Sequence, residues 1–175
     1  PFVGEVWEWH QDYIYWRNED AMPDPRVVTA AVYIDDVDEF NGPMVMIPGS
    51  HREGVLPCQN DVIEDGGDGP HWLSHLSARL KYTIDRRVLS GLARAHGLRA
   101  AKSPAGAVLL FDGNLAHASA PNISPFARSL LLVTYNRVDN APASANLTRP
   151  EFLVSRDSRP IEAVADDALE LEIRG

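Results

Sequence analysis

Three residues with metal-binding side chains, His10, Asp12 and His117, constrain the fold of this chain more than any other feature. In an extended strand the side chains at i and i+2 point to the same face, so a strand through residues 10–12 would direct His10 and Asp12 toward one ion. His117 lies more than a hundred residues later and would complete the ligand set. Two imidazoles and one carboxylate on one face of an ion are typical of non-haem Fe(II) oxygenases.

Arg128 extends this pattern, because it lies eleven residues after His117. Its planar guanidinium suits bidentate capture of a carboxylate. A ligand set that leaves one face of the ion open, together with a carboxylate clamp, indicates a 2-oxoglutarate-dependent oxygenase. A His-x-Asp pattern alone is short and also occurs on the surface strands of unrelated proteins, so the surrounding sequence decides the interpretation.

Short apolar runs bounded by turn residues predict a mainly β fold. Residues 27–34 are rich in β-branched side chains and predict a buried strand, and residues 44–47 predict a second strand between Gly-Pro and Pro-Gly pairs. Residues 107–111 and 129–135 are two further runs of strand length. Short strands with Gly and Pro turns and few long helices favour a β-sandwich or barrel.

Residues 53–102 differ from the strand-rich parts and predict a lid-like insertion. Residues 61–70 are acidic and rich in glycine, whereas residues 85–96 predict a helix. Asp85 is its expected N-cap and Gly97 follows its expected end. Its apolar positions recur at helical spacing: Val88, Leu89, Leu92 and Ala93. Residues 163–173 predict a short peripheral helix.

Three further segments accompany the candidate ligands: residues 41–51 (NGPMVMIPGSH), 106–112 (GAVLLFD) and 122–125 (NISP). With His10, Asp12 and His117 they resemble the phytanoyl-CoA dioxygenase family of Fe(II)/2-oxoglutarate-dependent oxygenases. Within it they are most similar to ectoine hydroxylases and to bacterial hydroxylases of free aliphatic amino acids such as leucine. The resemblance implies a double-stranded β-helix (jelly roll, cupin-like) that forms one catalytic domain over residues 1–175, with the metal inside its mouth.

The resemblance also implies how the co-substrate is bound. Ser119 and Arg128 match the spacing at which the family binds the distal carboxylate of 2-oxoglutarate, whose other end chelates the iron. The alternative for Arg128 is a surface salt bridge, and the alternative for Ser119 is a turn hydroxyl. Asp12 indicates hydroxylation, because halogenases of the wider group replace this carboxylate with a small residue.

Trp16 and Leu132 are the candidate substrate-binding residues. Trp16 stands where ectoine hydroxylases place a pocket tryptophan, and plain core packing is an equal alternative. Arg17, Glu19 and Asp20 are expected on a loop, either solvated or paired with a zwitterionic substrate. At Leu132 ectoine hydroxylases carry a phenylalanine that packs on the substrate ring. Leucine has no aromatic face, so this departure favours a flexible aliphatic substrate over ectoine.

Composition limits the binding partners and the cellular compartment that we expect for this protein. The formal net charge of −9 argues against nucleic acid and mildly against acyl-CoA. Cys58 is the single cysteine, so an intrachain disulfide is impossible and a reducing cytoplasm is expected. The sequence has no apolar run of membrane-spanning length and no signal peptide. The chain begins at Pro1, shortly before the first candidate ligand, so we expect a preceding N-terminal portion that the family carries.

Together these features predict a hydroxylase that uses Fe(II), 2-oxoglutarate and O2 to oxidise an unactivated C–H bond, with succinate and CO2 as products. A small free amino acid is the expected substrate, and a leucine-like aliphatic one is favoured. Alternatives within the family are ectoine, an acyl-CoA or a carrier-bound intermediate. A non-catalytic jelly-roll binding protein is the alternative outside enzymology, although such a protein has no need of three ligands and Arg128. The oligomeric state stays open.

Overall fold

The structure is a computed structural model that describes residues 2, 4–59, 80–143 and 149–165 of the 175-residue chain. Its strands are β1 (Trp7–His10), β2 (Val27–Tyr33), β3 (Met44–Met46), β4 (Cys58–Gln59), β5 (Thr83–Ile84), β6 (Arg99–Ala101), β7 (Val108–Asp112), β8 (His117–Ser119) and β9 (Leu130–Asn136). Its helices are α1 (Tyr13–Asp20), α2 (Arg86–His96) and the short 3-10 helices η1 (Ser50–Glu53) and η3 (Val138–Asn140). Strands therefore dominate the described residues, as the sequence predicted.

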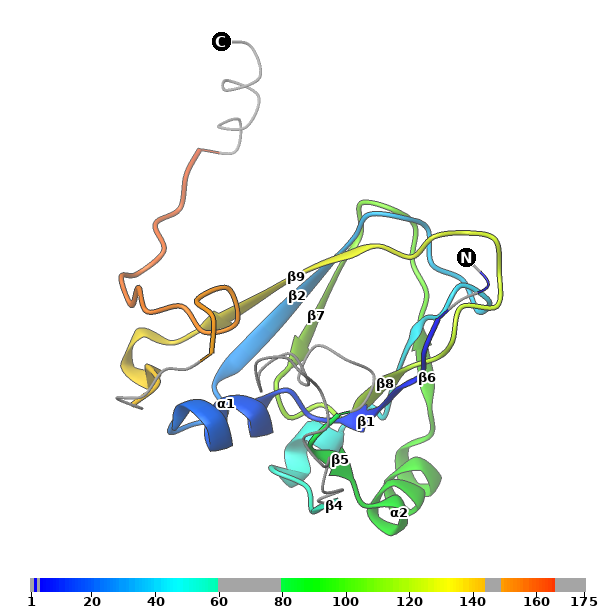
Figure 1. Cartoon of the computed structure of the whole chain (residues 1–175), viewed down its shortest axis with the longest axis horizontal. Helices are drawn as coiled ribbons and strands as arrows, with labels where there is room; N and C mark the ends of the chain where they lie inside the picture. Colours follow the sequence, from blue (N-terminus) through cyan, green and yellow to red (C-terminus); the bar gives the residue numbers. More distant parts are fainter. Residues whose placement is uncertain (1, 3, 60–79, 144–148, 166–175) are drawn as a thin grey trace, which may run out of the picture.

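Two antiparallel sheets face each other across the core (Figure 1). The strand order is β1-β8-β3-β6 in the four-stranded sheet and β7-β2-β9 in the three-stranded sheet, while β4 and β5 form a separate pair. Side chains from both sheets pack in one buried cluster: Ala31, Met44, Phe111 and Leu115. Strands that are distant in sequence are neighbours in both sheets, and this arrangement brings β1 beside β8.

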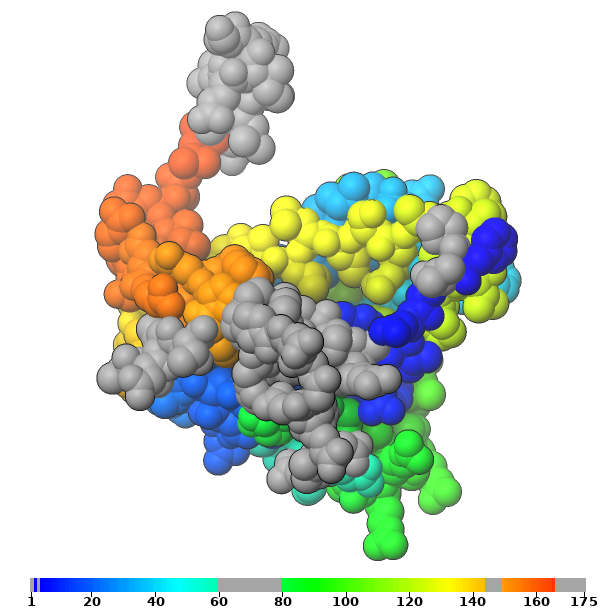
Figure 2. Space-filling view, in the orientation of Figure 1, coloured from blue at the N-terminus to red at the C-terminus, as the bar shows by residue number. Residues whose placement is uncertain are grey.

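The four apolar runs all form strands, and each strand end lies within one residue of its predicted position. Only one face of the three-stranded sheet is buried, although β2 and its partners carry apolar side chains on both faces. The outer face leaves a set of apolar side chains exposed, and β9 lies open at the surface in Figure 2. This set comprises Val28, Val108, Leu110, Leu131, Val133 and Tyr135.

Helix α2 matches its prediction in bounds, caps and buried face. The Asp85 carboxylate accepts hydrogen bonds from the backbone N–H groups of Arg87 (2.7 Å) and Val88 (3.3 Å), and Gly97 ends the helix at a φ of 72°. The predicted apolar positions of α2 pack against a buried cluster at the four-stranded sheet: Ile47, Leu56, Ile84 and Ala116. No helix in the described part of the chain is long and apolar enough to cross a membrane.

The lid over residues 53–102 stays a prediction, because residues 60–79 lie outside the described residues. The end of this segment belongs to the fold itself, since β6 pairs with β3 in the four-stranded sheet. Of the helix predicted over residues 163–173, residues 163–165 are not helical and the remainder lies outside the described residues.

Residues 12–20 depart from the prediction of a strand followed by a loop. Strand β1 ends at His10, and Asp12 has the right-handed helical angles φ −70° and ψ −40° at the N-cap of α1. The helix ends at Ala21, which has a positive φ of 52°. Tyr13 and Tyr15 are both buried, so tertiary packing on several sides stabilises a helix that lacks a clear amphipathic pattern.

The acidic residues at the end of α1 have protein partners. Asp20 is 1% exposed and forms an ion pair with Arg149, which is 7% exposed. Glu19 accepts hydrogen bonds from the Lys81 ammonium (2.7 Å) and the Tyr82 hydroxyl (2.6 Å). These contacts join α1 to residues 81–82 and to the C-terminal segment, instead of leaving the carboxylates on a solvated loop.

Replacing Asp20 with asparagine is expected to destabilise the protein by about 3–5 kcal/mol, because Arg149 would keep an uncompensated buried charge. Urea denaturation of the two proteins measures this difference. The control is Asp157→Asn, which breaks the exposed Asp157–Arg159 pair and should change stability little. Equal effects at the two sites would contradict a special contribution from burial.

Candidate metal centre

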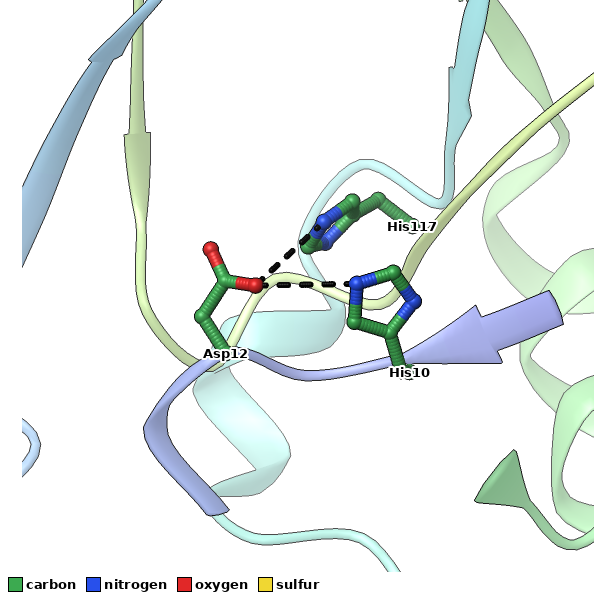
Figure 3. Close-up of side chains that lie close together, drawn as sticks. All are labelled: His10, Asp12 and His117. Atoms are coloured by element: carbon green, nitrogen blue, oxygen red, sulfur yellow. Dashed lines mark ion pairs between the residues drawn. The ribbon is translucent and has the colours of Figure 1, made fainter. Parts of the chain in front are cut away.

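His10, Asp12 and His117 come together where β1 and β8 meet. His10 is the last residue of β1, and it lies opposite His117, the first residue of β8. Their side chains converge with that of Asp12 (Figure 3), and one donor atom from each lies within 4.8 Å of the other two. Asp12 Oδ1 is 3.6 Å from the Nε2 atom of each histidine. The structure thus gathers the three predicted ligands into one cluster.

Local backbone contacts orient both imidazoles. His10 Nδ1 lies 2.7 Å from the Glu8 carbonyl oxygen, and His117 Nδ1 lies 2.9 Å from the Leu115 carbonyl oxygen. Because a carbonyl oxygen only accepts, each Nδ1 carries the hydrogen, and each Nε2 keeps a lone pair directed toward Asp12. This is the tautomer that a metal ion bound through Nε2 requires.

The electrostatic environment keeps His10 neutral. Burial and the neighbouring His117 lower the pKa of His10 to about 3, so its imidazole carries no charge at pH 7. Burial also raises the pKa of the Asp12 carboxyl. A bound divalent cation would reverse that effect, because an opposite charge favours the carboxylate. A cation between the two side chains would therefore meet a neutral imidazole from His10 and would offset the burial of Asp12.

The donor set fits Fe(II), because two neutral imidazoles and one carboxylate on one side of an ion leave other positions open. The His117 ring packs edge-on against Phe111 of the opposite sheet, with ring centres 5.2 Å apart. The cluster therefore faces the space between the two sheets. The Asp12 side chain is 25% exposed and both histidines are 9% exposed, so the cluster is accessible from the Asp12 side.

Arg128 is a half-buried cation two residues before β9. Burial lowers the pKa of its guanidinium, and the nearby Tyr33 partly offsets that effect. Within the described ranges, no ion pair links Arg128 to an acidic side chain. Ser119 lies two residues after His117 on β8, so the two side chains share a face of that strand. A desolvated cation without an acidic partner is suited to bind an anion.

Trp16 packs within the protein rather than facing only a pocket. Its indole N–H donates a hydrogen bond to the Leu153 carbonyl (3.2 Å), and its ring contacts a cluster that contains Tyr13 and Val27. The indole also lines a groove of about 380 Å³ between α1, the end of β9 and residues 153–161. Trp16 is thus a packing residue that also lines this groove, and its role in substrate binding stays a prediction.

A series of side-chain contacts connects this groove to the candidate metal centre. It reaches Thr134, whose hydroxyl lies 2.9 Å from that of Thr29. Thr29 is opposite Phe111 in the sheet, and Phe111 contacts His117. Thr29 and Phe111 therefore lie between this groove and the His117 ring.

Leu132 lies on the face of β9 that is directed toward the core. It pairs with Ala31, and residues directly opposite each other in an antiparallel pair share a face. Ala31 belongs to the cluster between the sheets, yet the Leu132 side chain is 59% exposed. Leu132 therefore borders open space on the inner side of the three-stranded sheet.

The sequence did not indicate two buried residues, Gln11 between two candidate ligands and Tyr33 near Arg128. Tyr33 is buried, donates a hydrogen bond to the Ala101 carbonyl (3.1 Å) and lies near Arg128. Gln11 is 1% exposed, although a polar residue between two inward-facing ligands is expected to point outward in a strand. No periodic pattern marks either residue, because both depend on contacts between distant segments.

Comparison with known proteins identifies similar sequences and folds. The family profile described as phytanoyl-CoA dioxygenase (PhyH) matches residues 1–130. The L-proline trans-4-hydroxylase of Streptomyces griseoviridis is 41% identical over 95% of this chain and 60% of its own length. The ectoine dioxygenase of Halomonas elongata is 38% identical over 95% of this chain and 48% of its own length.

Two solved structures of EctD from S. alaskensis have a similar fold. The structure with bound Fe superposes with a TM-score of 0.68 at 32% identity over 91% of this chain and 49% of that one. The structure with 2-oxoglutarate and 5-hydroxyectoine gives a TM-score of 0.65 at 33% identity, over 89% and 48% of the two chains. The chain thus spans about half the length of these structures and 48–60% of the two curated relatives.

Proposed function

Because the chain belongs to the phytanoyl-CoA dioxygenase (PhyH) family, we propose that it is the catalytic part of an Fe(II)/2-oxoglutarate-dependent hydroxylase. The observation that carries this proposal is the cluster of His10, Asp12 and His117, with both Nε2 atoms turned toward the carboxylate. The two facing sheets then correspond to the two halves of a jelly roll, and the metal centre lies between them.

In this function His10, Asp12 and His117 hold iron on one side and leave its other side to the co-substrates. When bound, iron with 2-oxoglutarate and O2 supplies the oxidant that inserts one oxygen atom into a C–H bond while 2-oxoglutarate becomes succinate and CO2. Arg128 binds the distal carboxylate of 2-oxoglutarate through charge-assisted hydrogen bonds, and the Ser119 hydroxyl adds another. The fact that supports this role of Arg128 is its half-buried guanidinium without an acidic partner in the described residues.

A small free amino acid with an aliphatic side chain is the proposed substrate. Leu132 supports it, because an open leucine on the inner face accommodates an aliphatic group and offers no aromatic surface to a planar ring. A leucine-like amino acid is the first candidate. L-proline is the second, since a relative of 41% identity is described as an L-proline trans-4-hydroxylase. Ectoine is the alternative that other relatives suggest.

The test is a screen of the full-length protein with Fe(II), 2-oxoglutarate and O2 against the twenty amino acids and ectoine. Mass spectrometry should detect the gain of one oxygen atom in an aliphatic amino acid, together with succinate. Efficient oxidation of ectoine alone would overturn the substrate proposal and leave the hydroxylase standing. A protein that binds Fe(II) but forms no succinate under any condition would instead be a binding protein.

Leu132→Phe should slow hydroxylation of the native substrate by about 5- to 150-fold, because a phenylalanine would occupy the open space that we propose for the substrate, and overpacking the filled site costs about 1–3 kcal/mol. Binding of 2-oxoglutarate and substrate-independent succinate formation should persist. The matched control is Leu131→Phe, since Leu131 is exposed on the opposite face of the same strand. If both variants slow the reaction equally, Leu132 does not line the substrate site.

A further inference from the structure

One buried side chain, that of Gln11, links the segments that carry the candidate ligands. Its Nε2 donates hydrogen bonds to the carbonyl oxygens of Asn114 (2.5 Å) and Gly54 (2.8 Å). Its Oε1 accepts a hydrogen bond from the Leu56 backbone N–H (2.8 Å). Both amide hydrogens and the carbonyl oxygen therefore have partners, and the side chain is almost completely shielded from solvent, with 1% exposed.

These partners lie on two segments that are distant from Gln11 in the chain. Gln11 itself stands between His10 and Asp12, and Asn114 lies three residues before His117. Gly54 and Leu56 follow the short helix η1. The amide thus connects the segment of the first two ligands directly to the segment of the third.

The strand pairing alone holds these two segments weakly. β1 and β8 share two register pairs, Trp7 with Ser119 and His10 with His117, and the register shifts between them. Past His10 the strand has ended, so Asp12 lies beyond the last ladder position. A short and irregular ladder leaves the spacing between the two ligand segments dependent on other contacts.

One backbone contact supports the same connection. The Tyr13 N–H donates a hydrogen bond to the Gly113 carbonyl (2.9 Å). Gly113 also packs closely against β2, because a Cβ at this position would lie 2.4 Å from Val27 Cγ2. The loop before His117 is therefore hydrogen-bonded to both residues that flank Asp12, through the Gln11 side chain and the Tyr13 backbone.

We propose that Gln11 is a positioning residue that sets the distance between the His10–Asp12 pair and His117. This inference rests on the proposed metal centre. The amide group is required, because a side chain of this shape must donate two hydrogen bonds to carbonyl oxygens and accept one from an N–H. A glutamate of the same size would place a carboxylate oxygen against the Asn114 and Gly54 carbonyls and keep only the bond from Leu56.

The expected effect of Gln11→Glu is a loss of metal affinity of about 10- to 100-fold, the range observed when side chains that support metal ligands are replaced. The probe is Co(II), titrated anaerobically into the full-length protein and followed by its visible absorption bands. These bands report ligand geometry, so their position should shift as well. Gln11→Leu removes the hydrogen bonds without adding a charge, and it decides the matter if Gln11→Glu does not fold.

Asn140→Asp is the matched control. Asn140 is also 1% exposed, and its Nδ2 donates hydrogen bonds to the Asp24 carbonyl (2.7 Å) and to Asn136 Oδ1 (2.8 Å). Its Oδ1 accepts a hydrogen bond from the Asp24 N–H (2.8 Å). The same exchange of amide for carboxylate thus removes the same kind of bonds at a site that contacts neither of the two ligand segments. We expect a lower Tm with unchanged Co(II) affinity and absorption.

Three outcomes would overturn the inference. Wild-type Co(II) affinity and absorption in a folded Gln11 variant would show that the amide does not position the ligands. An equal loss of affinity in Asn140→Asp would show that general destabilisation is responsible. Failure of the wild-type protein to bind Co(II) or Fe(II) would remove the proposed metal centre together with this inference, and it is distinguishable from the first two outcomes.

Discussion

Asp12→Ala is expected to abolish hydroxylation without weakening the fold. The carboxylate is the single anionic member of the proposed ligand set, so without it a divalent cation would keep two neutral protein ligands and no protein charge to offset its own. Asp12 stands at the N-cap of α1 but forms no capping hydrogen bond there. Burial raises the pKa of its carboxyl and outweighs the opposing effect of His117, so removing the group from the metal-free protein should cost little stability. The substitution should therefore abolish activity and leave the free energy of unfolding nearly unchanged.

Three measurements on the full-length protein check this expectation. Product formation should fall below detection, and the Tm of the metal-free variant should equal or exceed that of the wild type. Anaerobic Fe(II) with 2-oxoglutarate should give the visible charge-transfer band of the chelate in the wild type and not in the variant. His10→Ala and His117→Ala should lose activity in the same way.

Asp85→Ala is the control, and we expect it to lower stability without lowering activity. Asp85 caps α2 through hydrogen bonds from Arg87 and Val88, so its removal should lower the Tm and leave turnover per folded molecule unchanged. Ordinary hydroxylation by Asp12→Ala would contradict the assignment of the ligand set.

Arg128→Ala is expected to raise the 2-oxoglutarate concentration required for half-saturation by about 10- to 150-fold. Charge-assisted bidentate hydrogen bonds contribute about 1.5–3 kcal/mol, which corresponds to this range. Arg128→Lys should recover only part of the loss, because an ammonium group cannot form the planar fork. Titration of the charge-transfer band with 2-oxoglutarate measures binding directly.

The stability of the Arg128 variants should change little, because no ion pair to Arg128 is present in the described residues. The control is Arg26→Ala, which removes an exposed arginine paired with Asp24. Its 2-oxoglutarate requirement should equal that of the wild type. An unchanged requirement in Arg128→Ala would mean that another group binds the distal carboxylate.

Local patterns in the sequence predicted much of the fold. The apolar runs at residues 27–34, 44–47, 107–111 and 129–135 became β2, β3, β7 and β9, because β-branched and apolar residues between Gly and Pro turns favour strands. Helix α2 was predicted with both caps, since Asp85, Gly97 and the apolar spacing are all local signals. The three candidate metal ligands were also named from the sequence, and the structure brings them together.

Residues around the site were predicted less completely. His10 and Asp12 were expected to share a strand face, whereas the strand ends at His10 and Asp12 reaches the cluster from the first residues of a helix. Burial of Tyr13 and Tyr15 against distant segments stabilises that helix, and no periodicity within residues 12–20 reveals it. The ion pair of Asp20 with Arg149 likewise joins residues far apart in the chain.

The sequence by itself determined which side chains are candidate metal ligands and where four of the strands begin and end. It also determined both caps of α2. Only the tertiary structure decided how the ligands meet. The register of β1 against β8, the contact of Gly113 with Tyr13 and the three hydrogen bonds of Gln11 all join segments that are distant in the chain. Many different sequences can form such packing and backbone hydrogen bonds. The contacts therefore cannot be recognised from a local sequence pattern.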